Sequence, residues 1–146
     1  MKRILNKKTL TQYGNVEQRK QLIQILEAAL NSADPFLNTK KLLKREKDFL
    51  YIGAKEFEPF NDPKTGIEKV DLSKINKIYV VGAGKGSQRV AKAIEDVIGD
   101  KIVEGHVIDK KGSDKILCKI DVTFGGHPVP DSDCVFGSFK IVDILK

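Results

Sequence analysis

The sequence contains no tryptophan, one methionine and only two cysteines, Cys118 and Cys134. The cysteines form no CxxC pair and no recognisable metal-binding or redox motif, so we expect reduced thiols in a cytoplasmic protein. No apolar run approaches the roughly 18 residues that would indicate a membrane-spanning helix. The basic start, MKRILNKKTL, is followed by no apolar stretch, which argues against a secretory signal.

The whole chain has a net charge of +6, and its positive charge is concentrated in the first third. Residues 1–47 hold 11 Lys and Arg against 4 Asp and Glu, hence +7, and the remainder holds 15 against 16, hence −1. A basic segment can bind nucleic acid or acidic lipid, but no nucleic-acid motif and no aromatic RNP-type strand accompanies this one. We interpret it as a solvated helical face and expect no nucleic-acid and no membrane partner.

The first half of the chain predicts helices and then a small β-ribbon. A helix is expected over residues 15–32, with Asn15 as a possible cap, and a shorter one over 36–43 after the break at ADP. The first helix carries an apolar stripe made of Leu22, Ile25, Leu26, Ala29 and Leu30. FLYIGAKEF and GIEKVDL predict two short strands around the turn-rich NDPKTG.

The pattern changes at residue 77. KIYVVG is a continuous apolar run bounded by glycine, typical of a strand covered on both faces. Residues 85–98 predict an amphipathic helix that stops at Gly99, and its buried stripe consists of Val90, Ile94, Val97 and Ile98. IVEGHVI and IDVTFGG predict two more strands. The segment between them is short for a parallel crossover, so we expect that they are not adjacent parallel neighbours.

A last helix follows the loop HPVPDSD, where Asp131 or Ser132 can act as the cap. Its apolar residues recur at helical spacing: Val135, Phe136, Phe139, Val142 and Leu145. The whole order predicts an α/β fold, a Rossmann-like three-layer sandwich with a mostly parallel sheet, preceded by amino-terminal helices and a small β-ribbon. We expect one domain over 1–146, with helices in 1–44, the ribbon and its connection in 45–76 and the α/β core in 77–146.

The strand, glycine turn and helix in YVVGAGKGS can form an anion site. Amides in the first turn of a helix lack intrahelical partners, and the helix dipole leaves about +0.5 charge there. Gly82 and Gly84 allow a ligand to approach the backbone closely. The stretch is not a P-loop, because Gly86 follows Lys85 where Ser or Thr is required. It is not a complete dinucleotide fingerprint either, because Ser87 stands where the last glycine belongs.

Lys85 is the informative residue of this turn. A cation in the first turn of a helix opposes the dipole by about 0.3–1 kcal/mol. Its side chain either points into water or completes a phosphate or carboxylate site with the neighbouring amides and the Ser87 hydroxyl. The glycines on both sides favour binding. The dinucleotide fingerprint also needs an acidic residue at the end of the next strand, and Glu104 and Asp109 flank that strand without deciding whether the fingerprint applies.

The loop GGHPVPDSD follows another strand and is expected at the same carboxyl edge of the sheet, where open α/β sheets bind ligands. His127 could donate to a substrate, and Asp131 could accept from it or bind a cation. Alternatively, His127 hydrogen-bonds its own loop and Asp131 is only a helix cap, which is the commoner duty of such an Asp.

Taken together, YVVGAGKGSQRVAKAIED and GGHPVPDSD resemble the MOFRL-type glycerate 2-kinases, also called type II glycerate kinases. VEQRKQLIQILEAALNSADP and KVDLSKINKIYVVGAGK look like the opening helix of that family and its approach to the first strand. The resemblance covers nearly the whole chain. Some members of the family have carried the label hydroxypyruvate reductase.

The resemblance implies ATP-dependent phosphorylation of D-glycerate to 2-phosphoglycerate, with ATP and Mg²⁺. The important lysine of the family falls on Lys85, which would neutralise a substrate carboxylate or the transferring phosphoryl group. The remaining implied binding residues lie on the glycine turn or on the HPVPDSD loop: Gly82, Gly84, Gly86, Ser87, His127 and Asp131. Many members have alanine where Gly86 stands, so this turn is expected to be looser.

Members of the family are much longer and continue into a glycine- and serine-rich loop and a second domain. We therefore expect this chain to correspond to the amino-terminal part of a two-domain enzyme, as a truncated gene product, a subunit of a split enzyme or a fragment. We expect it to be inactive alone and to pair with a second copy or a carboxyl-terminal partner chain. The alternatives are a SIS-type sugar-phosphate isomerase domain, which leaves GHPVPDSD unexplained, and a vestigial module without enzymatic activity.

Overall fold

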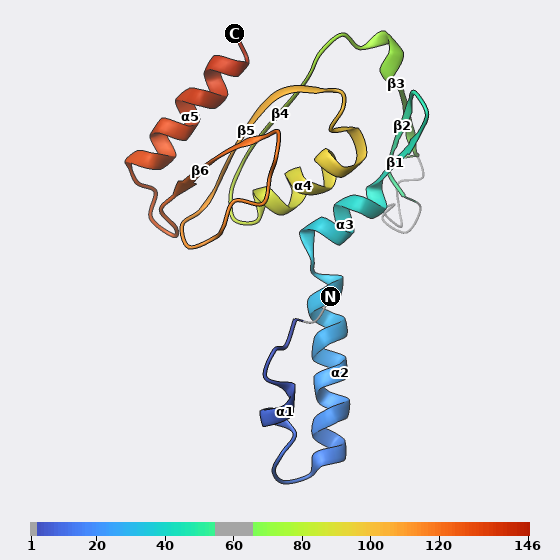
Figure 1. The fold of residues 1–146 in the computed structure, drawn as a ribbon, viewed down its shortest axis with the longest axis vertical. Coiled ribbons are helices and arrows are strands. Elements are labelled where there is room, and N and C mark those ends of the chain that lie inside the picture. Colours follow the sequence, from blue (N-terminus) through green and yellow to red (C-terminus); the bar gives the residue numbers. More distant parts are fainter. Residues whose placement is uncertain (1–2, 55–65) are drawn as a thin grey trace.

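The computed structural model describes residues 3–54 and 66–146. The first elements are helices and short strands: α1 Lys7–Leu10, α2 Val16–Ser32, α3 Pro35–Leu42, β1 Leu43–Glu46, β2 Phe49–Ile52 and β3 Glu68–Asp71. A 3-10 turn, Leu72–Lys74, leads to the main sheet and its helices: β4 Ile78–Ala83, α4 Ser87–Ile98, β5 Ile102–Lys110, β6 Asp121–Gly125 and α5 Ser132–Ile144. This order confirms the predicted α/β fold with helices and a ribbon before a parallel sheet (Figure 1).

Helices α1 and α2 form an arm that projects from the rest of the molecule (Figure 1). The helix predicted over 15–32 is confirmed as α2, although the Asn15 side chain makes no cap hydrogen bond in the part of the chain that the structure describes. Only Ile23 of α2 is buried. The predicted apolar stripe instead faces solvent at Leu22, Ile25, Leu26 and Leu30. Periodicity thus located the helix, but no other described element covers its apolar side.

The ribbon has three strands where the sequence predicted two. Strand β1 pairs antiparallel with β2, and β2 pairs antiparallel with β3. The extra strand begins at Leu43, the predicted last residue of the preceding helix. Arg45 of β1 reaches the end of α4, where its Nη2 lies 3.0 Å from Oδ2 of Asp100. Local propensity could not predict this strand, because the contact joins residues far apart in the sequence. Most of the predicted NDPKTG turn lies outside the described residues.

The main sheet has the order β4-β5-β6, and both pairings are parallel. Helix α4 covers one face and α5 the other, which confirms the predicted three layers (Figure 1). Side chains alternate between these faces, as strand geometry requires. Val107 packs into the core with Ala91 and Ile98 of α4, whereas its neighbour Ile108 contacts Gly137 of α5.

The prediction that the second and third core strands are not adjacent was wrong, because β5 pairs directly with β6. A loop replaces the usual crossover helix. Its Leu117 and Ile120 are buried in the core beside α4. The carboxylate of Glu95 in α4 accepts hydrogen bonds from the backbone N–H groups of Cys118, Lys119 and Ile120, at 2.8–3.2 Å. Side chains of α4 thus satisfy the backbone of the loop, and a short connection suffices.

The prediction that KIYVVG is covered on both faces was also wrong. Tyr79 and Val81 of β4 are each 39% exposed. Strand β4 lies at one edge of the sheet, while α5 packs mainly on β5 and β6. In α4, Ile98 is buried and Ile94 and Val97 pack against the core, but Val90 is 38% exposed.

Candidate functional site

The glycine turn between β4 and α4 depends on two residues with positive φ. Gly84 has φ +129° and Gly86 has φ +90°, conformations that side-chain-bearing residues rarely adopt. Gly82, by contrast, lies within β4, where an added Cβ would make an ordinary 3.6 Å contact with Val107. Gly86 is the N-cap and the helix begins at Ser87. The prediction that Lys85 lies in the first turn was therefore wrong, because the left-handed Gly86 delays the start of the helix.

The amide groups at the start of α4 already have an anionic partner within the protein. The carboxylate of Asp109, at the end of β5, accepts hydrogen bonds from Gly86 N at 3.2 Å and from Gln88 N at 3.1 Å. It also accepts from Lys110 N at 2.7 Å, and Asp109 is only 6% exposed. The Ser87 hydroxyl donates to the carbonyl of Ile108 at 2.7 Å. These groups stabilise the turn from within the protein.

A hollow of about 400 Å³ lies at the carboxyl edge of the sheet, and we call it the basic hollow. Its wall includes Gly84 and Lys85 from the glycine turn and Gly126 and His127 from the loop after β6. The structure thus brings the two predicted stretches together, as the parallel strand order requires. A second hollow of about 330 Å³ lies on the side of Pro35 and Val90. It shares Gly84 and Lys85 with the basic hollow and is also lined by Gly82, Gly86 and Ser87.

Two lysines and the largely buried Asp109 are the charged residues that line the basic hollow, so its net charge is positive. Lys85 and Lys110 both line it, and both are exposed. Within residues 3–54 and 66–146, the structure shows no acidic side chain paired with either ammonium group. Sequence reasoning missed Lys110 and left the role of Asp109 open. The signal that could have found them is their position at the end of a buried strand, beside the turn that follows the preceding strand.

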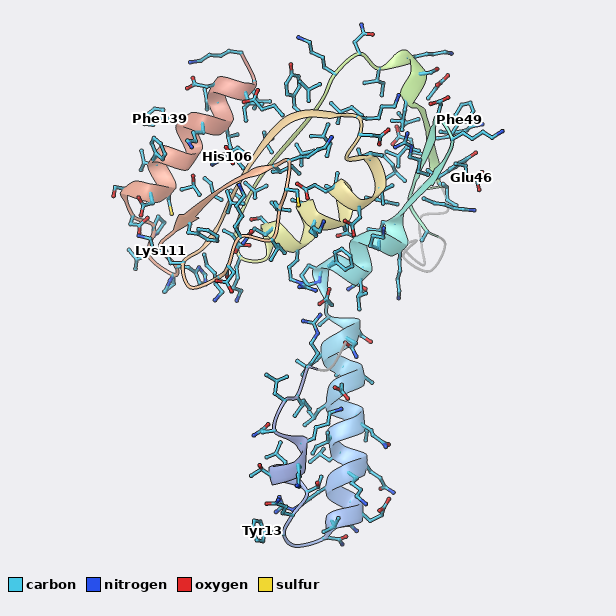
Figure 2. The ribbon with its side chains drawn as sticks, viewed as in Figure 1. Tyr13, Glu46, Phe49, His106, Lys111 and Phe139 are labelled. Atoms are coloured by element: carbon cyan, nitrogen blue, oxygen red, sulfur yellow. The ribbon has the colours of Figure 1, made fainter. Side chains whose placement is uncertain are left out.

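Asp131 is held by contacts inside the protein and does not line the basic hollow. It is the N-cap of α5 and accepts from Cys134 N at 3.2 Å. Its Oδ2 lies 2.7 Å from Nζ of Lys111, which also lies 2.6 Å from Asp133. The hydrogen bond from Lys111 holds the pKa of Asp131 well below its usual range, and Asp131 and Asp133 raise the pKa of Lys111. Figure 2 shows Lys111 near the start of α5.

The described residues do not by themselves fit a Mg²⁺ ion. Among them there is no group of three or more His, Cys, Asp or Glu side chains that could hold a metal. The carboxylate oxygens that Mg²⁺ prefers are engaged elsewhere, in Asp109 by backbone amides and in Asp131 by Lys111.

No helix in residues 3–54 and 66–146 is both long and apolar enough to span a bilayer.

Comparison with known proteins identifies the family. The profile of a family described as "Domain of unknown function (DUF4147)" matches residues 21–146. The chain belongs to this family. It is also similar to the glycerate 2-kinase of Pyrococcus horikoshii, with 28% identity over 124 residues. A second relative is the D-glycerate 2-kinase of Thermotoga maritima, with 32% identity over 80 residues.

A solved structure supports the same relationship. A crystal structure of a Pyrococcus horikoshii protein superposes with a TM-score of 0.66 and 26% identity, over 88% of this chain and 26% of the other. The sequence matches cover 85% and 53% of this chain but only 24% and 19% of the two kinases. The predicted relationship to glycerate kinases is thereby confirmed for this DUF4147 chain, which spans about a quarter or less of those relatives.

Proposed function

We propose that this DUF4147 chain forms one wall of a site for ATP-dependent phosphorylation of D-glycerate to 2-phosphoglycerate. The observation that supports this best is the basic hollow, in which Lys85 and the His127 loop meet at the ligand-binding edge of the sheet. The names of the two curated relatives support glycerate as the substrate over the phosphosugar of a SIS-type domain. The proposed reaction takes place in the cytoplasm.

In this proposal Lys85 is the catalytic residue and binds the substrate carboxylate or the transferring phosphoryl group. Phosphoryl transfer depends mainly on positioning and charge neutralisation, which an unpaired ammonium at the wall of a hollow can supply. Gly84 allows the ligand close to the backbone, and His127 donates a hydrogen bond from the opposite wall. Gly86 and Ser87 shape the turn, Gly82 lies in the strand that leads to it, and Asp131 anchors the loop that carries His127.

ATP would enter from the open side of the basic hollow. The described residues provide one wall only, so the nucleotide and its Mg²⁺ need groups beyond them. We propose that the chain works as the amino-terminal part of a two-domain enzyme, either within one polypeptide or with a carboxyl-terminal partner chain. Closure of such a cleft would exclude water from the transferring phosphoryl group.

Calorimetric titration of D-glycerate into wild type and Lys85→Met tests the proposal. Loss of a charge-assisted hydrogen bond should weaken binding about tenfold or more. Lys77→Met is the matched control, because Lys77 is an exposed lysine directly before the first residue of β4, whereas Lys85 follows the last residue of that strand. It should bind glycerate like wild type. Equal affinity of wild type and Lys85→Met would remove Lys85 from the site. Absence of glycerate binding in wild type would favour a non-enzymatic module.

A further inference from the structure

The anion at the amino terminus of α4 is a side chain of the protein itself, the carboxylate of Asp109. We propose that Asp109 is a positioning and specificity-determining residue. Its carboxylate occupies the amide cradle, which we define as the backbone N–H groups of Gly86 and Gln88. An external phosphate or carboxylate is thereby directed to the Lys85 ammonium in the basic hollow. The inference rests on the proposed function only for the identity of that external anion.

The geometry makes Asp109 a stable internal ligand. Its two oxygens are divided between the two amides of the cradle, with Oδ1 accepting from Gly86 N and Oδ2 from Gln88 N. The charge lies at the positive end of a 12-residue helix, where an anion is favoured. Asp109 is also 6% exposed. An external anion that displaced it would leave a buried carboxylate without its two partners in the cradle, with only the amide of Lys110 still donating to it, which is unfavourable.

The same contacts orient the basic side of the site. Lys85 lies between Gly84 and Gly86, and Gly86 is held by Asp109. Lys110 follows Asp109 directly, and its own amide donates to the same carboxylate at 2.7 Å. One buried side chain therefore fixes the backbone beneath both ammonium groups that line the basic hollow. Without it, the glycines of the turn would be free to adopt other conformations.

The test is an amide NMR titration of the ¹⁵N-labelled full chain with inorganic phosphate, and separately with D-glycerate. In wild type, phosphate should leave the amide resonances of Gly86 and Gln88 in place. In Asp109→Asn the charge is removed, and phosphate should then shift both resonances. Asp121→Asn is the matched control, because Asp121 lies at the start of β6 and its carboxylate pairs with Lys115. It should respond like wild type.

A phosphate-induced shift of Gly86 and Gln88 in wild type would overturn the inference, as would an unresponsive cradle in a folded Asp109→Asn variant. If Asp109→Asn does not fold, amide hydrogen exchange in wild type decides. If the Gly86 and Gln88 amides exchange slowly and phosphate does not change their rates, Asp109 is their ligand. If phosphate slows their exchange, the external anion binds them and the inference is contradicted. The proposed function fails separately if D-glycerate shifts the amide resonance of neither Lys85 nor His127, while Gly86 and Gln88 respond to phosphate only in Asp109→Asn.

Discussion

At the scale of single residues, charge pairs decide which side chains are available to a ligand. Lys111 is committed to Asp131 and Asp133, whereas its neighbour Lys110 faces the basic hollow. Both are exposed lysines in one short stretch of sequence. Composition therefore cannot separate a structural lysine from one that is free to bind, because the difference lies in which carboxylates the fold brings near.

The pair of Lys111 and Asp131 predicts a measurable change in protonation. In Lys111→Met the pKa of Asp131 should rise toward its ordinary value of about 3.9, because the main stabilising partner of the carboxylate is lost. Carboxyl-carbon NMR across acidic pH measures it. Lys115→Met, which removes the partner of Asp121, is the control and should leave Asp131 unchanged. An unaltered Asp131 pKa in Lys111→Met would contradict the ion pair.

Glu95 predicts how stability depends on pH. Burial opposes its charge, but N–H bonds from Ile120, Lys119 and Cys118 prevail, and its pKa is lowered. Stabilisation by such a carboxylate is fully present above the unfolded pKa of about 4.3 and is lost as pH falls through the folded value. Glu95→Gln should therefore lower the free energy of unfolding at neutral pH by about 1.5–3 kcal/mol and reduce the loss of stability below about pH 5.

Urea denaturation at several pH values measures both effects in Glu95→Gln. The control is Glu104→Gln, because Glu104 is exposed on β5. Its unfolding free energy should change by no more than about 0.5 kcal/mol. Equal stability of wild type and Glu95→Gln at neutral pH would show that the loop between β5 and β6 does not depend on this carboxylate.

At the scale of elements, α5 packs on the sheet through its smallest residue. Gly137 is the buried residue of this helix, and an added Cβ would lie 2.7 Å from Cγ1 of Ile108 and 3.1 Å from Cβ of Thr123. Ile141 and Ile144 on the same face are half-buried, whereas the other large apolar residues of the helix are exposed. Figure 2 shows Phe139 on the side of α5 turned away from the sheet, whereas His106 lies on the side toward it. The helix therefore has two apolar sides, and only one is covered.

Gly137→Ala tests this close packing. Alanine is favoured over glycine within a helix by about 1 kcal/mol, but the overlap with Ile108 should outweigh that gain. Overpacking in a filled core costs about 1–3 kcal/mol, so a net loss of unfolding free energy is expected. Ser138→Ala, at the exposed neighbouring position, should be close to neutral. A stabilised Gly137→Ala variant would show that α5 can move away from the sheet at little cost.

At the scale of the whole molecule, a large amount of apolar surface remains open to solvent. The predicted stripe of the last helix is confirmed as a helical stripe and is exposed by half or more at each position: Val135, Phe136, Phe139, Val142 and Leu145. The arm adds the exposed side of α2. The two apolar areas lie in different parts of the molecule, and large exposed apolar areas are typical of protein–protein contact sites. A second copy or a carboxyl-terminal partner chain is our proposal for what covers them.

Phe139→Asp tests self-association through α5. Light scattering of wild type should show a mass that rises with concentration, because burial of 65%-exposed Phe139 against a second copy removes apolar surface from water. A buried charge would oppose that contact, so Phe139→Asp should stay monomeric at higher concentration. Tyr13→Asp, at the tip of the arm (Figure 2), is the control and should associate like wild type. A wild-type protein that is monomeric throughout would contradict pairing with itself.

Much of the architecture was predictable from local pattern. Apolar spacing located α2, α4 and α5, Gly99 marked the end of α4, and Asp131 was identified as a possible cap. The glycine turn and the His127 loop were both expected at the carboxyl edge of the sheet, and they line the same hollow. The helices and their ends depend on hydrogen bonds and periodicities that span a few residues, so the sequence by itself determines them. The meeting of the two loops follows from the parallel direction of the strands.

Only the tertiary structure decided which partners those elements take. The loop between β5 and β6 replaces a crossover helix because Glu95, more than 20 residues earlier, satisfies its backbone. The cradle at the start of α4 is filled because Asp109, the penultimate residue of β5, lies beside it. Neither contact leaves a signal in local sequence, because each joins segments that meet only once the order of the strands is set. Strand order therefore decides which charges remain free to bind a ligand.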